Sequence, residues 1–331
     1  MRLSADELAF FRDHPPWGFI LFARNVSEPS QVRDLTAQMR EVAGRNDAPI
    51  LIDQEGGRVR RLRPPHWPFY PPARVCGLLF KENPEAGLRA AFLQSRLIAN
   101  DLHALGINVD CLPVLDTPVS DAHDIIGDRA YSQDPHEVAQ LGRAACEGLL
   151  AGGVLPVIKH IPGHGRARAD SHLALPVVDA TRRELGCTDF HPFLQLADMP
   201  LAMTAHVVYS QFDAKNPATS SRTMIRIVVR GWIGFDGLLM SDDLSMRALS
   251  GDYAQRTKRA FAAGCDVVLH CNGELAEMLE ISAATPLLRG SALKRAKHAL
   301  QRLREPDAAD IPALRAEFED LTARAGVSAA A

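Results

Sequence analysis

The sequence has no paired cysteines, no long apolar runs and no blocks of basic residues. Its six cysteines are scattered over 331 residues, and none shows the Cys-x-x-Cys spacing of a zinc or redox site. No apolar run is long enough to cross a membrane. Lysine and arginine number 37 against 40 aspartates and glutamates, so the formal net charge is -3. This balance argues against a dedicated nucleic-acid surface. We expect neither a nucleic-acid nor a membrane partner.

The first ten residues carry acidic side chains where a signal peptide has its apolar core. We therefore expect a cytoplasmic protein whose thiols stay reduced and mostly buried. No shift in composition and no low-complexity linker divides the chain. The simplest expectation is one domain over residues 1–305, followed by a C-terminal helix and disordered tail over residues 306–331, acting as a monomer.

Short apolar runs typical of β-strands alternate with helical patterns along the chain. This alternation favours a parallel α/β sheet, and the length suits a single (β/α)8 barrel of the TIM type. Only seven strands can be counted where a closed barrel needs eight. The predicted strands lie at 18–22, 48–52, 107–115, from 154 onward, 201–205, 237–240 and 266–269. The predicted helices lie at 30–42, 86–105, 135–151, 182–196, 254–263, 274–281 and 293–303.

The central strand leads into the most unusual stretch of the sequence. Lys159 and His160 come directly after its apolar residues, and His164, Asp170 and His172 follow within twelve positions. Pro162 and Gly163 separate the first two histidines, which excludes the two-on-one-helix-face geometry of zinc hydrolases. A neighbouring lysine also opposes a cation. We expect no metal and no cofactor, and instead a ligand that is anionic or rich in hydroxyl groups.

Polar residues recur where the predicted strands end, and a single cleft at the carboxyl edge of a sheet explains this recurrence. Asp53 suits bidentate binding of two sugar hydroxyls. Arg61 and Arg129, on two long loops, can bind hydroxyl, carboxylate or phosphate groups, although Arg61 alone is equally typical of a solvated loop. The strand-end residues are Asp53, Asp116, Lys159, His160, His206, Asp242 and His270.

Two further features suggest covalent chemistry. A carboxylate at Asp170 can orient the imidazole of His172 for proton transfer near neutral pH, although Asp-x-His also occurs in ordinary surface loops. Asp242, at the end of a strand, can attack a sugar's anomeric carbon. Asp243 is the alternative nucleophile, and strand alternation directs the two side chains to opposite faces.

Four motifs, taken in order, resemble the family 3 glycoside hydrolases. They lie at 52–59 (IDQEGGRV), 159–165 (KHIPGHG), 170–172 (DSH) and 241–246 (SDDLSM). The sequence is most similar to the short bacterial β-N-acetylhexosaminidases of cell-wall recycling. The likeness extends from the first predicted strand to about residue 303.

This resemblance implies roles for individual residues. Asp242 matches the family's nucleophile, His172 its general acid/base and Asp170 the partner of that histidine. Asp53, Arg61, Arg129, Lys159 and His160 match substrate-binding positions, and we give His164 a loop-shaping role. The implied reaction removes a non-reducing-end β-linked N-acetylglucosamine with retention of configuration. The implied substrate is N-acetylglucosamine joined to 1,6-anhydro-N-acetylmuramic acid, with or without peptide.

The resemblance leaves alternatives open. An imidazole acid/base does not repel phosphate, so a glycoside phosphorylase is the main alternative. A non-catalytic sugar-binding protein and a metal-dependent hydrolase are further ones. Relatives generally carry an extra apolar strand before the acidic helix that starts here near Ser4, in keeping with the count of seven. The resemblance therefore implies a barrel whose first strand is missing or replaced. Pro162, Gly163 and Gly165 suggest that the loop carrying His172 moves when substrate binds.

Overall fold

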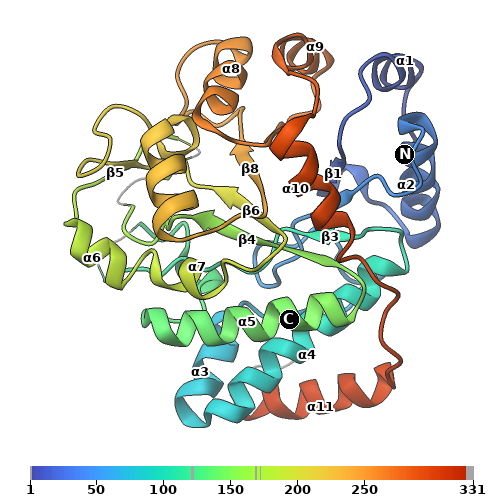
Figure 1. The fold of residues 1–331 in the computed structure, drawn as a ribbon. Helices are drawn as coiled ribbons and strands as arrows, with labels where there is room; N and C mark the ends of the chain where they lie inside the picture. Colours follow the sequence, from blue (N-terminus) through green and yellow to red (C-terminus); the bar gives the residue numbers. More distant parts are fainter. Residues whose placement is uncertain (1, 121–122, 168–169, 172, 326–331) are drawn as a thin grey trace. The chain divides into compact units, whose positions relative to one another are not determined.

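The computed structural model describes residues 2–120, 123–167, 170–171 and 173–325 (Figure 1). The chain forms two compact units. The first comprises residues 1–113, 143–156 and 300–331, and the second comprises residues 114–142 and 157–299. Each is built from parallel strands and helices that follow one another along the chain, which is the α/β pattern that the sequence predicts.

The sheet of the first unit contains β1 (Phe19–Leu21), β2 (Ile50–Ile52), β3 (Val109–Asp110) and the first residues of β4 (Leu155–Ile161). All its pairings are parallel, in the order β1-β2-β3-β4. Apart from the partly exposed Ile20, the apolar side chains of these strands are almost completely buried. Burial of each such side chain contributes about 1.5–3 kcal/mol to stability.

The helices of the first unit are α1 (Ala5–Asp13), α2 (Pro29–Ala43), α3 (Arg74–Glu82), α4 (Pro84–His103) and α11 (Ile311–Arg324), with the 3-10 turn η1 (Ala23–Asn25). Ser4 caps α1 through a reciprocal capping box with Glu7. Gly44 ends α2 in the left-handed conformation that glycine adopts without strain. In Figure 1, α3, α4 and α11 lie side by side.

The sheet of the second unit continues β4 from Val157 and adds β6 (Leu201–Thr204), β8 (Leu238–Asp243) and β9 (Val267–Leu269). These strands are parallel in that order, and Lys159, Met203 and Met240 are aligned across three of them. A separate two-stranded parallel sheet pairs β5 (Val177–Val178) with β7 (Val208–Tyr209). In the part of the chain that is described, the main sheet has seven strands, the number predicted.

Helix α5 (Pro135–Ala151) begins in the second unit and ends in the first. The other helices of the second unit follow its strands. They are α6 (Arg182–Cys187), α7 (His191–Gln195), α8 (Tyr253–Ala263), α9 (Leu275–Ala284) and α10 (Gly290–Leu300), with the 3-10 turns η2 (Gly127–Arg129) and η3 (Ala218–Ser220) and the π-helix η4 (Met224–Trp232). Among the described residues, no helix has both the length and the apolar character needed to span a bilayer.

Several predicted elements differ from the structure. The predicted helix 182–196 is two helices. α6 ends at Cys187, and α7 begins at His191 with Pro192 in its first turn, where an N–H has no partner within the helix. The predicted strand 107–115 shortens to two residues. The sequence also gave no indication of α3 or of η4. The C-terminal helix expected within 306–331 is α11, and the predicted disordered tail lies beyond its last turn, outside the described residues.

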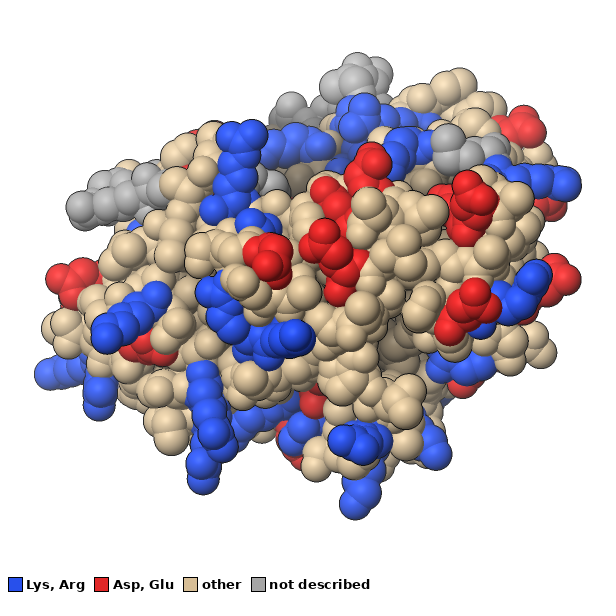
Figure 2. Space-filling view, turned by 90° about the horizontal axis from the view of Figure 1, so that it is seen from above, with Lys and Arg blue, Asp and Glu red and all other residues tan. Residues whose placement is uncertain are grey.

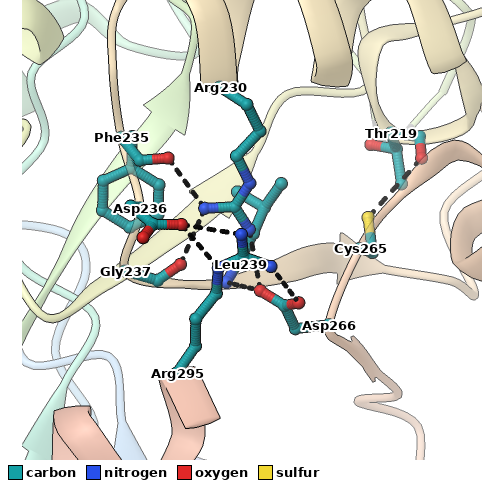
Figure 3. Close-up of polar contacts among 9 residues, drawn as sticks. All are labelled: Thr219, Arg230, Phe235, Asp236, Gly237, Leu239, Cys265, Asp266 and Arg295. Atoms are coloured by element: carbon teal, nitrogen blue, oxygen red, sulfur yellow. Dashed lines mark hydrogen bonds and ion pairs between the residues drawn. The ribbon is translucent and has the colours of Figure 1, made fainter. Parts of the chain in front are cut away.

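A buried ion-pair network holds the beginning of β8 (Figure 3). Asp266 Oδ2 accepts hydrogen bonds from Arg230 Nη2 at 2.7 Å and from the Leu239 N–H at 2.9 Å, and Oδ1 pairs with Arg295 at 3.2 Å. Arg230 also donates to the carbonyl oxygens of Phe235 and Gly237, each at 2.8 Å. The Asp266 side chain is only 5% exposed. Its removal would therefore leave a buried guanidinium and a backbone N–H without their acceptor.

We predict that Asp266→Ala destabilises the protein by about 3–5 kcal/mol, the usual cost of removing one partner of a buried ion pair. The control is Asp236→Ala. Asp236 pairs with Arg295 at 2.6 Å but is 83% exposed, so its loss should cost no more than about 1 kcal/mol. Urea unfolding of both variants measures the difference. Equal free energies of unfolding would contradict the assigned role of Asp266.

Candidate active site

The carboxyl-terminal half of β4 carries two polar side chains into a buried position. All seven residues of this strand are buried, and Lys159 and His160 are 2% and 8% exposed. The peptide bond between them is cis. The Lys159 carbonyl oxygen accepts the Leu115 N–H at 2.7 Å, which ties the end of β4 to the segment after β3.

Asp116 organises the residues that follow β4. Its carboxylate is completely buried, and Oδ2 lies 2.7 Å from His160 Nδ1. Oδ1 accepts the backbone N–H of His160 at 3.2 Å and that of His164 at 2.7 Å. Burial alone would raise the pKa of Asp116, but the neighbouring His160 and the hydrogen bonds to His160 and His164 lower it. Asp116 is therefore an anion that places a proton on His160 Nδ1 and orients the ring.

His164 is a buried histidine of a different kind. Burial lowers its pKa to about 4; the charge of His160 lowers it too, while Asp116 and Asp242 act in the opposite direction. The ring is consequently neutral near pH 7. Its Nε2 lies 3.1 Å from the hydroxyl of Ser171. These contacts fit the loop-shaping role predicted for His164 and place Asp242 within its electrostatic range.

The segment after β4 is anchored at successive residues. Tyr209 donates its hydroxyl hydrogen to the Gly163 carbonyl, and Val119 N–H donates to the Gly165 carbonyl at 3.1 Å. A Cβ atom added at Gly165 would lie 2.1 Å from the Thr117 carbonyl oxygen, so only glycine fits there. Arg166 pairs with the buried Asp189 at 2.7 Å. The proposed movement of this loop stays a prediction.

Ser171 separates the two residues of the predicted acid/base pair. His172 lies outside the described residues, so its geometry with Asp170 is not part of the described structure. The Ser171 carbonyl accepts the Ala248 N–H at 3.3 Å, and its hydroxyl contacts His164. Ser171 thus connects the segment after β4 with the segment after β8.

Asp242 and Asp243 end β8 and differ in their partners. Asp242 Oδ1 accepts the Asp243 N–H at 2.8 Å, and the Asp242 N–H points to Thr204 Oγ1 at 3.3 Å. The Asp243 carboxylate accepts the Ser245 and Cys271 N–H groups at 3.0 and 3.1 Å, together with the Ser245 hydroxyl. Asp243 therefore shapes the turn after β8, which leaves Asp242 as the better candidate nucleophile.

Asp53 and Arg61 meet within the first unit. Arg61 Nη2 lies 3.0 Å from Asp53 Oδ2, and its guanidinium is 5.0 Å from the centre of the Phe22 ring. Gln54 Oε1 accepts the backbone N–H of Arg61 at 2.8 Å and that of Leu62 at 3.0 Å. An arginine with these partners is part of a built cluster rather than a solvated loop residue.

Arg129 lies in the second unit, on η2. Its Nη1 donates to the Ile125 carbonyl at 3.3 Å. Ile126, three residues earlier, packs against Val114 and Ala130 and fixes this turn. The face of the molecule seen in Figure 2 carries both basic and acidic side chains, and neither sign covers it alone.

The predicted site residues thus fall into two groups. Asp53 and Arg61 form a pair in the first unit. In the second unit the parallel strands β4, β6 and β8 bring Lys159, His160 and Asp242 to the same edge. Sequence reasoning noted Asp116 and His206 only as polar residues at strand ends and missed Thr204 and Thr219. Thr219 contacts His206, and Thr204 contacts the Asp242 N–H. These pairs are separated in the sequence, so no local sequence pattern predicts them.

Comparison with known proteins gives one consistent result. The model of the glycosyl hydrolase family 3 N-terminal domain matches residues 5–305. The β-hexosaminidase of Methylococcus capsulatus is 40% identical over 298 residues, 86% of each chain. The β-hexosaminidase of Pseudomonas aeruginosa is 38% identical over 284 residues, 85% of this chain and 82% of that one.

Solved structures agree. NagZ from Neisseria gonorrhoeae in complex with N-trifluoroacetyl-D-glucosamine has a TM-score of 0.87 and 31% identity over 98% of this chain and 95% of that one. This likeness and the parallel sheet confirm the predicted TIM-type α/β class. The chain belongs to glycosyl hydrolase family 3.

Proposed function

We propose that the protein is a retaining exo-β-N-acetylglucosaminidase that removes N-acetylglucosamine from the non-reducing end of muropeptide fragments. The observation that carries the proposal is the carboxylate of Asp242, which is held at the end of β8, at the same edge of the sheet as Lys159 and His160 on β4, with β6 between the two strands. The β-hexosaminidase relatives and the sugar-bound NagZ support the choice of sugar.

The reaction proceeds by double displacement. Asp242 attacks the anomeric carbon, the glycosidic C–O bond breaks, and His172 gives its proton to the departing oxygen. Water then loses a proton to His172 and attacks the same carbon, which releases the sugar and restores the Asp242 carboxylate. Asp170 orients the ring of His172 and stabilises its protonated form. Retaining glycosidases commonly use a second carboxylic acid in this role, and here an imidazole replaces it.

Substrate binding rests on the remaining predicted residues. Lys159 and His160 donate hydrogen bonds to sugar hydroxyls, and Asp116 orients the His160 ring through its Nδ1. Arg129, Asp53 and Arg61 supply further charged hydrogen-bonding groups. We infer that the substrate is N-acetylglucosamine joined to 1,6-anhydro-N-acetylmuramic acid, with or without peptide, and that a monomer turns it over in the cytoplasm during cell-wall recycling.

The first prediction concerns the nucleophile. Asp242→Ala should lower kcat on a chromogenic β-N-acetylglucosaminide by about 10⁴-fold or more and leave sugar binding intact, because no other group forms the covalent intermediate. Steady-state kinetics and calorimetric titration with N-acetylglucosamine measure both quantities.

Asp243→Asn is the matched comparison. It weakens the turn after β8, so we expect a lower melting temperature and a much smaller loss of kcat. If the Asp242 variant kept most of its turnover while the Asp243 variant lost it, Asp243 would be the nucleophile.

The second prediction concerns the proton donor. His172→Ala should lower kcat/KM by about 10²–10⁴-fold for a substrate with a poor leaving group, and far less for a dinitrophenyl glycoside, whose departure needs no protonation. His298→Ala, which removes an exposed histidine of α10, should leave both rates unchanged. Equal losses on the two substrates would remove His172 from the acid/base role.

The third prediction separates hydrolysis from phosphorolysis. Digests of the same substrate with and without phosphate should yield free N-acetylglucosamine at equal rates. Product analysis by NMR identifies the sugar. N-acetylglucosamine 1-phosphate as the main product in phosphate buffer would make the enzyme a phosphorylase.

A further inference from the structure

Three completely buried polar side chains lie next to the end of β8. Thr204 is the last residue of β6, His206 follows it by two positions, and Thr219 lies in η3. All three have 0% exposure. Polar groups removed from water cost free energy unless they are hydrogen-bonded, so their contacts indicate what they do.

Their contacts form one continuous chain. The Asp242 N–H points to Thr204 Oγ1 at 3.3 Å, and Thr204 Oγ1 lies 2.7 Å from Thr219 Oγ1. Thr219 Oγ1 lies 2.7 Å from His206 Nδ1, and His206 Nε2 lies 3.0 Å from the Asp243 carbonyl oxygen. This series of hydrogen bonds begins at the Asp242 N–H and ends at the Asp243 carbonyl, on the backbone of the dipeptide that carries the candidate nucleophile.

The direction of each hydrogen bond follows from the chemistry of its ends. A carbonyl oxygen can only accept, so His206 Nε2 carries a hydrogen. Burial lowers the pKa of His206, while Asp242 and Asp243 act in the opposite direction. With its hydrogen on Nε2, the ring presents Nδ1 to Thr219 as an acceptor.

The two hydroxyl groups complete the assignment. Thr219 has one hydroxyl hydrogen, and His206 Nδ1 is a nearer acceptor than the Ala205 carbonyl at 3.1 Å. The Thr204 hydroxyl then donates to Thr219 and accepts the Asp242 N–H. Each hydroxyl group then accepts one hydrogen bond and donates one, so all the hydrogen bonds run in one direction, from the Asp242 N–H to the Asp243 carbonyl.

We propose that Thr204, Thr219 and His206 are positioning residues that fix the backbone on both sides of Asp242 and thereby aim its carboxylate. The proposal rests on the function proposed for Asp242. His206 and Thr219 touch no reacting atom in it. Their effect passes through the Asp242 N–H and the Asp243 carbonyl, which hold the backbone that carries the Asp242 side chain. Misplacement of a reacting group by about 1 Å can cost about 100-fold in rate.

Thr219 provides the sharpest test. Thr219→Val keeps the shape of the side chain and removes its hydroxyl group, so it interrupts the series of hydrogen bonds between Thr204 and His206. We expect kcat on a chromogenic β-N-acetylglucosaminide to fall about 10- to 100-fold, with KM changed by less than about twofold. Thr219→Ser restores the hydroxyl and should recover most of the kcat.

The matched control is Thr257→Val. Thr257 is also fully buried, and its hydroxyl donates to the Tyr253 carbonyl within α8 at 2.7 Å. Both valine variants should lose similar thermal stability, yet only Thr219→Val should lose kcat. Unchanged kcat in Thr219→Val, or an equal fall in both variants, would overturn the proposal.

Two substitutions of His206 test the two hydrogen bonds of its ring separately. His206→Gln retains a donor for the Asp243 carbonyl, and His206→Asn retains an acceptor for Thr219. Each should lower kcat, and wild-type kcat in both would contradict the positioning role. If these variants fail to fold, Thr204→Val and Thr204→Ser give the same test at the Asp242 N–H.

Asp242→Asn separates this inference from the proposed function. If that variant keeps its turnover, the proposed function is wrong and the positioning role falls with it. If it is inactive while Thr219→Val has normal kcat, only the positioning role is wrong.

Discussion

The carboxylate of Asp116 accepts hydrogen bonds from His160 and His164, and the geometry at the end of β4 depends on these hydrogen bonds. The group is completely buried, a position that normally disfavours negative charge. Its three donors reverse that effect and keep it ionised. One anion therefore fixes the orientation of the His160 ring and the path of the backbone towards Gly165.

The strand that carries Asp242 is held at both ends by buried polar groups. At its beginning, Asp266 accepts a hydrogen bond from the Leu239 N–H and pairs with two arginines (Figure 3). At its end, the Asp242 N–H and the Asp243 carbonyl join the network around His206. Such groups contribute little net stability when satisfied, but they permit few alternative arrangements. The strand therefore has a well-defined position where a reacting carboxylate requires one.

Sequence reasoning predicted the features that depend on local pattern. The alternation of strands and helices gave the α/β class, and the polar residues at strand ends gave Lys159, His160 and Asp242. It could not predict contacts that depend on packing. Asp116 is 44 residues from His160 in the sequence, and nothing near it distinguishes an ion-pair partner from an ordinary strand end. The division between α6 and α7 likewise follows from a short connection whose residues carry no strong breaking signal before Pro192.

The donors to Asp116 differ in how they respond to sequence change. Two of the three are backbone N–H groups, at His160 and His164, and the backbone of any residue except proline supplies an N–H. Replacement of the His164 side chain by alanine would leave its bond to Asp116 intact. The acceptor has no such substitute, because only the side chain at position 116 provides the carboxylate. Side-chain replacements around this loop would therefore detect the contribution of the Asp116 carboxylate, but not that of the two backbone N–H groups that it binds.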